Sequence, residues 1–329
     1  MTGVSGITRT WITSALYFFA LTASNALAGD AGERQSLDDA WWTGPIVAAG
    51  AGTLPQGHAL IEPYLYDVVR DGHFNDEGER RSVPRSHGYG SLTYVLYGLT
   101  DRFTAGLIPV FGYNDVSYGQ DSSGIQTGDV TLQGQYRLSQ FHEGSRTPTT
   151  SIVVQETLPT GKYDRLTNLN DGLGSGAYTT TIALYSQTYL WMPNGRLLRT
   201  RLNVSWAFSN NVSLEDASVY GTAHGFRGEA QPGDEFTANS SWEYSITRNW
   251  VFALDLIYQH DDNTYVNGVD SDGQPVNQNS GSAWRFGMAP AIEYNWNSRT
   301  GLIVGNRWFA AGRNTSATVT PAVALNMVF

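Results

Sequence analysis

The chain has 329 residues, and its formal net charge of −10 at pH 7 argues against nucleic acid as a partner. It contains no cysteine, which excludes a disulfide framework, thiolate chemistry and a thiolate metal site. Only 15% of residues are charged, whereas 12% are aromatic and 36 are glycines, which favours one all-β unit with aromatic girdles and many turns. The mean hydropathy of −0.29 is compatible with a membrane barrel, because barrel strands turn half of their residues away from lipid.

The N-terminus has the pattern of a secretory signal peptide. Arg9 precedes a mostly apolar stretch at 11–22, and Ala26-Leu27-Ala28 is a small-x-small cleavage site, so we predict a signal peptide over 1–28 with cleavage after Ala28. Residues 29–56 are expected to form a periplasmic N-terminal segment, either tucked into or against the following domain or disordered. No apolar run of about 18 residues follows, so no membrane helix is expected.

Residues 57–329 form a series of strand-like runs with period-two alternation. One face of the run 198–208 carries Leu202, Trp206 and Phe208, and the other carries Arg199 and Arg201. Because an arginine at the bilayer midplane costs about 2–4 kcal/mol, the apolar face must point to lipid. We predict an all-β fold, a transmembrane antiparallel up-and-down β-barrel of about 12 strands, with both termini on one side. The twelve runs are 58–69, 89–98, 102–113, 127–138, 149–161, 176–190, 197–209, 234–246, 249–260, 283–296, 300–311 and 315–329.

The connections between these runs alternate in length. Long connections towards the outside and short turns towards the periplasm are typical of outer-membrane barrels. The long connections are 70–88, 114–126, 162–175, 210–233 and 261–282, and the shorter ones include 98–101, 139–148, 192–196, 247–249 and 297–299. The exception is the last outer loop, at 312–314, which is short.

The closing strand, 318–329, resembles the C-terminal strand of bacterial outer-membrane barrels. It ends on an aromatic residue and alternates apolar side chains, so Val323, Leu325, Met327 and Phe329 form the expected signal for the assembly machinery. A closed barrel requires this strand to pair with the first run, 58–69, in antiparallel orientation. Pro321 has no N–H and should therefore occupy an unpaired ladder position or a bulge.

Four segments resemble the outer-membrane family called MetA-pathway of phenol degradation. They are YGLTDR at 97–102, GDVTL at 128–132 with YRL at 136–138, LPTGK at 158–162 and GLGSG at 172–176. The resemblance covers about residues 57–190. It implies an outer-membrane transporter linked to the uptake or degradation of aromatic compounds, and it supplies no binding residues. On their own chemistry these segments are turns and strand ends.

Charged residues on the predicted inward faces are the candidate lumen lining. Twelve strands fall between the roughly eight that side chains fill and the roughly sixteen that leave an aqueous channel, so a narrow polar lumen is expected. These residues either form a constriction that selects small permeants or pair across the lumen as a structural network. The candidates are Asp129, Arg137, Arg199, Arg201, Glu235, Glu243, Asp255, Arg285, Glu293 and Arg307.

Catalytic and metal chemistry finds little support. The sequence has no Gly-x-Ser-x-Gly motif, and His260 with its acidic neighbours is better explained as a solvated rim. The stretch 270–273 has part of a calcium-loop pattern but lacks the later acidic ligand. We therefore expect no catalytic residue, no metal and no cofactor.

The predicted function is that of a bacterial outer-membrane channel or transporter for small hydrophobic or aromatic compounds. Its expected partners are the lipid bilayer, the assembly machinery and the permeant. Two alternatives remain: a structural or surface-interaction barrel with a plugged lumen, and an outer-membrane lipid hydrolase.

Overall fold

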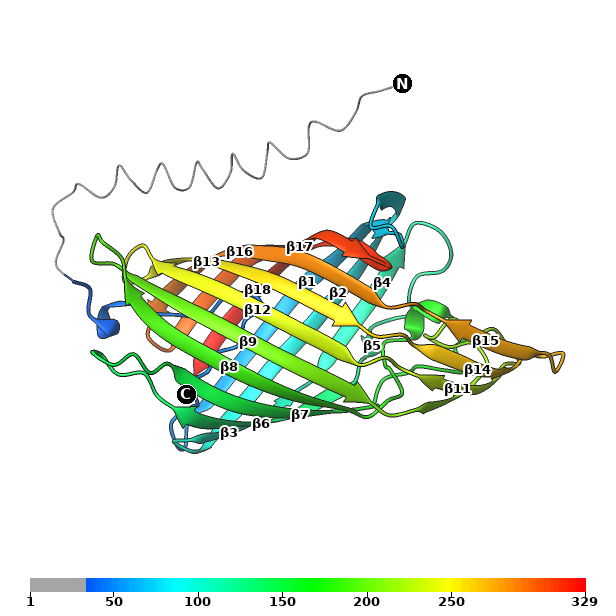
Figure 1. Ribbon diagram of the computed structural model, residues 1–329, viewed down its shortest axis with the longest axis horizontal. Helices are drawn as coiled ribbons and strands as arrows, with labels where there is room; N and C mark the ends of the chain where they lie inside the picture. The colour runs from blue at the N-terminus through cyan, green and yellow to red at the C-terminus, as the bar shows by residue number, and fades with distance from the viewer. Residues whose placement is uncertain (1–33) are drawn as a thin grey trace, which may run out of the picture.

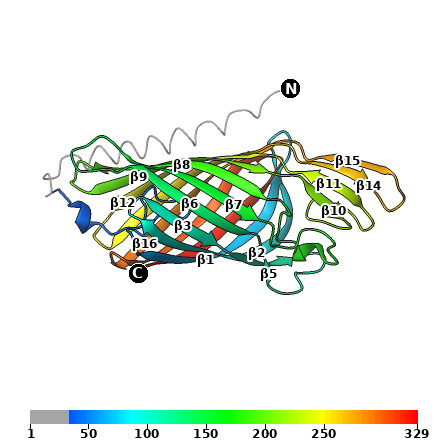
Figure 2. The same ribbon diagram turned by 90° about the horizontal axis from the view of Figure 1, so that it is seen from below.

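Residues 34–329, which the computed structural model describes, form one closed antiparallel β-barrel with a projection at one end (Figures 1 and 2). The main sheet has fourteen segments, and because β3 continues into β4 and β5 into β6, they make twelve wall strands. Pairing of β1 with both β2 and β18 closes the ring. The predicted fold class and strand number are confirmed. The expected signal peptide and its cleavage site lie outside the described residues.

The wall strands are mostly 10 to 16 residues long, with β2 longer, as membrane-crossing tilted strands require. They are β1 (Ala59–Phe74), β2 (Arg80–Thr100), β3 (Phe103–Ile108), β4 (Val110–Val116), β5 (Gln126–Thr127), β6 (Val130–Ser139), β7 (Thr149–Leu158), β8 (Thr179–Trp191), β9 (Leu197–Ser209), β12 (Glu235–Ser245), β13 (Trp250–Asp261), β16 (Ala283–Asn297), β17 (Thr300–Arg313) and β18 (Thr315–Val328). Two short 3-10 helices, η1 (Leu37–Asp39) and η2 (Leu169–Asp171), lie outside the wall strands. Within residues 34–329, no helix combines the length and apolarity needed to cross a membrane.

The first and last strands pair as expected. Leu60 lies opposite Val328 and Leu65 opposite Val323 in an antiparallel register. Towards β1 the ladder skips Pro321, as its missing N–H predicts, whereas towards β17 Pro321 lies opposite Asn306 within a continuous register. The predicted loop at 70–88 is wrong, because β1 and β2 continue as a paired hairpin whose tip is only 75–79. The polar residues there were compatible with a loop, but pairing beyond the bilayer needs no apolar face.

The two faces of the wall differ in the way the alternation predicts. On β7, Ile152 and Val154 are 42% and 48% exposed on the outer surface, whereas Ser151 and Val153 face inward and are fully buried. Outward aromatic rings form a contiguous row across four strands near the outer end: Trp206, Phe236, Tyr258 and Trp284, with centroids 5.6 to 6.5 Å apart. At the other end Trp250 packs on Tyr294 at 4.7 Å. These rows are the two interfacial girdles.

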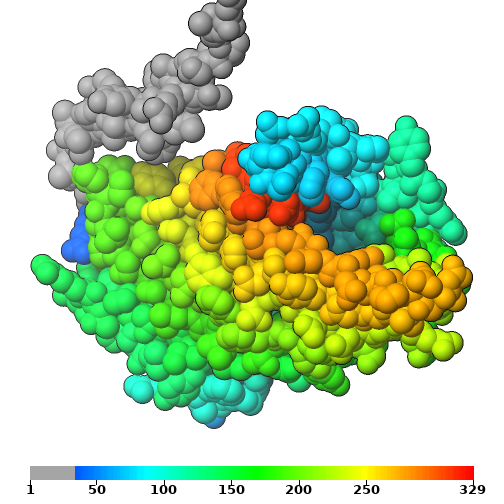
Figure 3. Space-filling view, turned by 45° about the vertical axis from the view of Figure 1, so that its right-hand side comes forward, coloured from blue at the N-terminus to red at the C-terminus, as the bar shows by residue number. Residues whose placement is uncertain are grey.

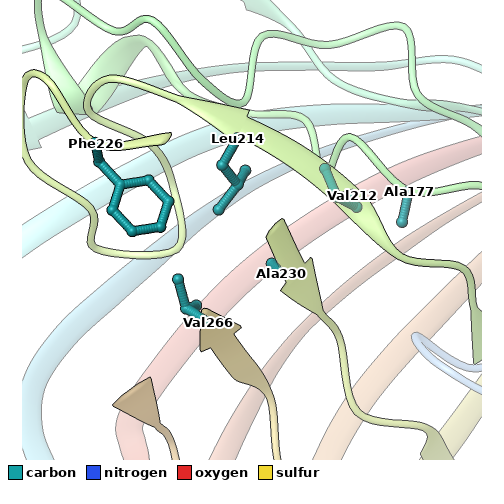
Figure 4. Packing of buried hydrophobic residues seen from close by; sticks show 6 residues of the cluster. All are labelled: Ala177, Val212, Leu214, Phe226, Ala230 and Val266. Carbon is teal, nitrogen blue, oxygen red and sulfur yellow. The ribbon is translucent and has the colours of Figure 1, made fainter. Parts of the chain in front are cut away.

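A second sheet projects from the outer end of the barrel. It contains β10 (Val212–Glu215), β11 (Arg227–Gln231), β14 (Tyr265–Val269) and β15 (Pro275–Asn279) in that order. The expectation that 210–233 and 261–282 are plain loops is therefore wrong. Its small apolar core joins Leu214, Phe226 and Val266 (Figure 4), and this burial stabilises strands too short to persist alone.

The two ends of the barrel have different connections. The chain from Arg34 enters at the end where Phe329 also lies, and there the turns are short (Figures 1 and 2). The backbones of Ala59 and Phe329 exchange hydrogen bonds of 3.2 and 2.8 Å. The long connections and the second sheet lie at the opposite end, so the structure has the outside and periplasmic ends that loop length predicted.

Candidate functional site

Residues 41–56, which we call the inner segment, run through the lumen before β1 begins. The segment enters beside the turn between β12 and β13, where the N–H of Trp41 donates to Arg248 O (3.1 Å). It leaves beside the turn between β2 and β3, where the N–H of Gln56 donates to Asp101 Oδ1 (2.9 Å). Between these points it crosses from the β13–β17 side of the wall to the β6–β7 side, so it spans the interior of the barrel.

Two wall carboxylates bind the backbone of the first half of the inner segment, residues 43–48. Glu293 Oε2 accepts hydrogen bonds from the N–H groups of Thr43 (2.7 Å) and Gly44 (3.0 Å). Asp255 accepts from Val47 and Ala48, each at 3.1 Å and each at a different carboxylate oxygen. Both carboxylates are fully buried, so the donated N–H groups offset part of the cost of removing the charges from water.

Donor side chains of the wall bind the backbone carbonyls of the second half of the inner segment, residues 48–52. The guanidinium of Arg201 donates to Ala48 O at 2.5 Å, and Asn203 Nδ2 donates to Ala49 O at 2.9 Å. Gln135 Nε2 donates to both Gly50 O and Gly52 O at 3.1 Å. Acids therefore meet the segment where it presents N–H groups, and donors meet it where it presents carbonyls.

Small residues make room for the segment along one wall. A Cβ added at Gly301 would lie 1.9 Å from Thr43 Oγ1, and one at Gly305 would lie 2.9 Å from Ile46 Cγ1. Ile46 also packs against a buried cluster that contains Ala253 and Ile303. Side chains of ordinary size at the two glycines would exclude the segment from its path.

A buried ion cluster lies below the crossing. Arg199 and Glu243 form a bidentate pair, with Nε donating to Oε2 at 2.7 Å, and Arg201 Nε lies 3.0 Å from the same Oε2. The Arg199 guanidinium also stacks over the Trp42 ring at 4.6 Å. One acid thus pairs with two arginines of β9, and the second arginine also binds the inner segment.

Two cavities lie on either side of the crossing. The inner cavity, about 360 Å³, lies between the segment and the wall, and its lining includes Glu62, Tyr64, Tyr94 and Tyr185. Tyr64 and Tyr94 meet edge to face at 6.0 Å, and Asn326 Nδ2 donates to Glu62 Oε1 at 3.1 Å. The combination of phenol rings, leucines and a few polar groups is typical of small-molecule cavities.

The outer cavity is larger, about 740 Å³, and opens towards the long loops. Tyr66, Gly90, Leu173 and Arg285 are among its lining residues. In the space-filling view the barrel mouth is recessed between the cyan hairpin of β1 and β2 and the orange segment around β15 (Figure 3).

Nine of the ten predicted lumen residues divide into three groups. Arg199, Arg201, Glu243, Asp255 and Glu293 converge on the inner segment, as described above. Further out, Arg285 Nε donates to Gln259 Oε1 (2.7 Å), Glu235 Oε1 accepts from Thr237 Oγ1 (2.9 Å), and the Arg307 guanidinium stands over Phe309 at 5.5 Å. Arg137 follows Gln135 on β6 towards the periplasmic end, and no side-chain partner within residues 34–329 is observed for it.

Asp129 lies away from both cavities and organises an outer loop. Its Oδ1 accepts from Gly161 N (2.9 Å), and its Oδ2 accepts from Ser175 N and Oγ (both 2.7 Å). Gly161 and Gly174 touch backbone to backbone, since a Cβ on either would lie under 3.0 Å from the other. Three of the motif segments, 128–132, 158–162 and 172–176, therefore meet at this carboxylate, and the expectation of a lumen-lining Asp129 gives way to a loop-fixing role.

Polar contacts also fix the tip of this loop. Asp171 Oδ1 accepts from Ser123 N at 2.7 Å and Oδ2 accepts from Ser123 Oγ at 2.8 Å, which lowers the pKa of the Asp171 carboxyl. Tyr220 donates its hydroxyl to Ser175 O at 2.6 Å, and burial followed by the nearby Asp129 charge raises the pKa of Tyr220 to about 12. The hydroxyl therefore stays protonated and the loop stays tied to the second sheet.

Several lining residues were not among the sequence candidates. Glu62 and Tyr64 alternate with outward Ile61 and Leu65 on β1, and Gln133 and Gln135 alternate on β6 in the same way. The period-two pattern contained this signal, because Glu62 and Tyr64 share one face of β1 and Gln133 and Gln135 share one face of β6. The four residues of the expected assembly signal all belong to the closing strand region, and Phe329 is 62% exposed. Their role in assembly stays a prediction.

These observations define a class: a membrane-spanning β-barrel with a chain segment across its lumen. A family model described as "Putative MetA-pathway of phenol degradation" matches residues 67–320. The chain belongs to this family, as the four motif segments indicated, and the match extends well beyond residue 190, where the sequence resemblance ended. No curated protein matches the chain.

Solved structures share the barrel architecture. The COG4313 outer membrane channel from Pseudomonas putida F1 aligns with a TM-score of 0.63 at 17% identity, over 86% of this chain and all of that one. The Ralstonia pickettii toluene transporter TbuX aligns with a TM-score of 0.40 at 11% identity, over 88% and 95% of the two chains. The P. putida toluene transporter TodX gives 0.40 at 12% identity, over 91% and 100%. The first likeness supports the fold.

Proposed function

We propose that this protein is an outer-membrane channel for small hydrophobic or aromatic molecules, and that the inner segment is its closing element. The observation that carries the proposal is the position of the segment across the lumen, with a cavity on each side. A permeant entering from the long-loop end meets the outer cavity first, then the crossing, and then the inner cavity beside the periplasmic turns.

The size and chemistry of the cavities support a small aromatic permeant. An apolar cavity of about 150 Å³ is enough to hold benzene, and both cavities here are larger. Tyr64, Tyr94 and Tyr185 offer ring faces and edges to an aromatic molecule, and their hydroxyls offer hydrogen bonds to a ring substituent. Membership of a family named for phenol degradation is consistent with this substrate class.

The manner in which the segment is bound supports a movable element. Its backbone is held by side chains of the wall, and between Thr43 and Leu54 its hydrogen bonds go to residues such as Asp255, Asn203 and Gln135. Water can replace each of these contacts when the segment leaves. The wall strands keep their own hydrogen bonds to one another, so the ring of strands stays intact when the segment leaves.

The same bonds also favour a second candidate, a structural barrel whose lumen stays plugged. In that case the segment would be a permanent part of the core, like the buried polar networks of other proteins. The two candidates differ in one property, which is whether solutes cross the folded barrel.

Liposome uptake of radiolabelled benzoate and toluene, with planar-bilayer conductance, tests the proposal. We expect uptake by the wild-type barrel and a larger conductance for a variant that lacks residues 43–52. Heat-modifiable migration in gels verifies that each barrel is folded. Uptake no greater than in empty liposomes for both folded proteins would overturn the channel proposal and support the plugged barrel.

A further inference from the structure

The outer surface of the barrel carries a groove that differs from the rest of the lipid-facing wall. It has a volume of about 380 Å³ and crosses β8, β9 and β12. Its lining includes Ser186, Thr188, Thr200, Ser240, Trp242 and, from the turn between β6 and β7, Arg146. Four neighbouring hydroxyls thus face the membrane where apolar side chains are the rule.

The strand register fixes the depth of this groove. Thr200 lies directly opposite Trp242 on one side and Thr188 on the other. Each of these residues is three positions from the periplasmic end of its strand, and Trp242 belongs to the periplasmic level of outward aromatics. Ser186 and Ser240 are two positions deeper. The groove therefore runs from the periplasmic interface a short way into the hydrocarbon layer.

The polar groups of the groove have no protein partners. Throughout residues 34–329, the hydroxyls of Ser186, Thr188, Thr200 and Ser240 make no hydrogen bond to another protein group, and no carboxylate lies within 4.0 Å of the Arg146 guanidinium. Glu143, on the same turn, is already paired with Arg34 at 3.3 Å. Unpaired hydroxyls in hydrocarbon cost free energy, and a ligand that carries acceptor oxygens would remove that cost.

A second groove on the same surface gives the contrast. It also measures about 380 Å³, and its lining is dominated by Phe103, Leu132, Tyr136, Ile152 and Val154, all suited to acyl chains. Its one charged residue, Glu156, already accepts a hydrogen bond from Thr180 Oγ1 at 2.6 Å. The hydroxyl groove instead combines a cation at the interface, hydroxyls just below it and a tryptophan at its side. An anionic phosphate at Arg146 and ester oxygens at the hydroxyls match this order of groups along the membrane normal.

We propose that the hydroxyl groove binds one glycerophospholipid of the periplasmic leaflet whose headgroup carries a net negative charge, with no cation to compete with Arg146 for the phosphate. Arg146 binds the phosphate, Thr200 and Ser240 donate to the ester oxygens, and Trp242 packs against the glycerol region. This site is separate from the lumen and does not depend on the channel proposal.

Native mass spectrometry of the full barrel, titrated with phosphatidylglycerol or with phosphatidylcholine, tests the site. We expect the wild type to retain one phosphatidylglycerol and to prefer it to phosphatidylcholine. Arg146→Glu should weaken retention about tenfold or more, since a charge-assisted contact becomes a repulsion. Thr200→Val with Ser240→Ala should weaken retention of both lipids.

Arg299→Glu is the matched control, because Arg299 is an exposed arginine in the turn between β16 and β17. Its phosphatidylglycerol retention should equal that of the wild type, and gel heat-modifiability verifies folding of every variant. Equal weakening by both arginine variants, or no headgroup preference, would overturn the proposal. A dimer mass that disappears in Ser240→Trp would also overturn it, by assigning the groove to a second copy of the chain.

Discussion

Two irregular segments of this barrel, the inner segment and the outer loop at 159–178, are held in opposite ways. The inner segment is held mainly through its backbone groups, and the wall supplies the side chains that bind them, such as Glu293 and Asp255. The outer loop is bound at Asp129 and is also joined to the second sheet, whose apolar core includes Ala177. Water can replace the polar contacts of the inner segment, and its release would cost the packing of Ile46 against the wall. Release of the outer loop would also remove part of the core of the second sheet, which is why we propose the inner segment as the movable element of the two.

The largest expected effect falls on the ion cluster beneath the inner segment. Glu243→Gln would leave Arg199 and Arg201 buried without their counter-charge, so the free energy of unfolding should fall by about 3–5 kcal/mol. Urea titration of barrels embedded in lipid vesicles measures this free energy of unfolding. Glu235→Gln is the control, since Glu235 sits in a looser polar group, and a similar loss in both variants would contradict the role given to the cluster.

Asp129→Ala should come next, because it removes three hydrogen bonds to one carboxylate. At about 1.5–3 kcal/mol for a bond to a charged group, and with partial replacement by water, a loss of about 3 kcal/mol in loop stability is expected. Limited proteolysis should then cut within 159–178. Asp270→Asn serves for comparison, because Asp270 accepts backbone N–H groups at an exposed tip. If Asp129→Ala resisted proteolysis as well as the wild type does, the Asp129 carboxylate would not be what stabilises this loop.

Asp255→Asn should affect conductance more than stability. The amide retains one acceptor oxygen but presents an N–H₂ group to the second backbone donor, so the bond from either Val47 or Ala48 is lost. More frequent channel openings are expected in planar bilayers, with a decrease of about 1–3 kcal/mol in unfolding free energy. Asp262→Asn at the exposed rim should leave both quantities unchanged. Unaltered openings in Asp255→Asn would indicate that this carboxylate does not retain the segment.

The sequence predicted the wall strands much better than the inner segment or the second sheet. Alternation such as that of Arg199 and Arg201 with Thr200 and Leu202 is a local property, so strand number and facing followed from it. The inner segment depends on contacts such as Thr43 with Glu293, 250 positions apart, and no local pattern encodes them. The second sheet escaped prediction because β11 and β15 contain glycine, proline and amide residues, and they become strands through pairing and burial.

The smallest expected effect is a pH response of the outer loop. Ser123 lowers the pKa of Asp171 below its unfolded value, so the resulting stabilisation is present above the ordinary aspartate pKa and is lost as pH falls through the lowered one. Hydrogen-exchange protection factors at 121–126, which are corrected for the intrinsic pH dependence of amide exchange, should be unchanged from pH 8 to pH 6 and fall in strong acid. Ser123→Ala should start this loss of protection at higher pH. Identical profiles for the two proteins would contradict the assignment.

The most direct test of the movable inner segment is a reversible covalent lock. The chain contains no cysteine, so Thr43→Cys with Asn295→Cys introduces a single possible disulfide between the segment and β16, where Thr43 Oγ1 lies 2.9 Å from Asn295 Oδ1. We expect the oxidised barrel to be closed in planar bilayers and to regain wild-type openings after reduction, with each single-cysteine variant insensitive to reductant. Equal conductance in the oxidised and reduced states, with the cross-link verified by mass, would contradict the account.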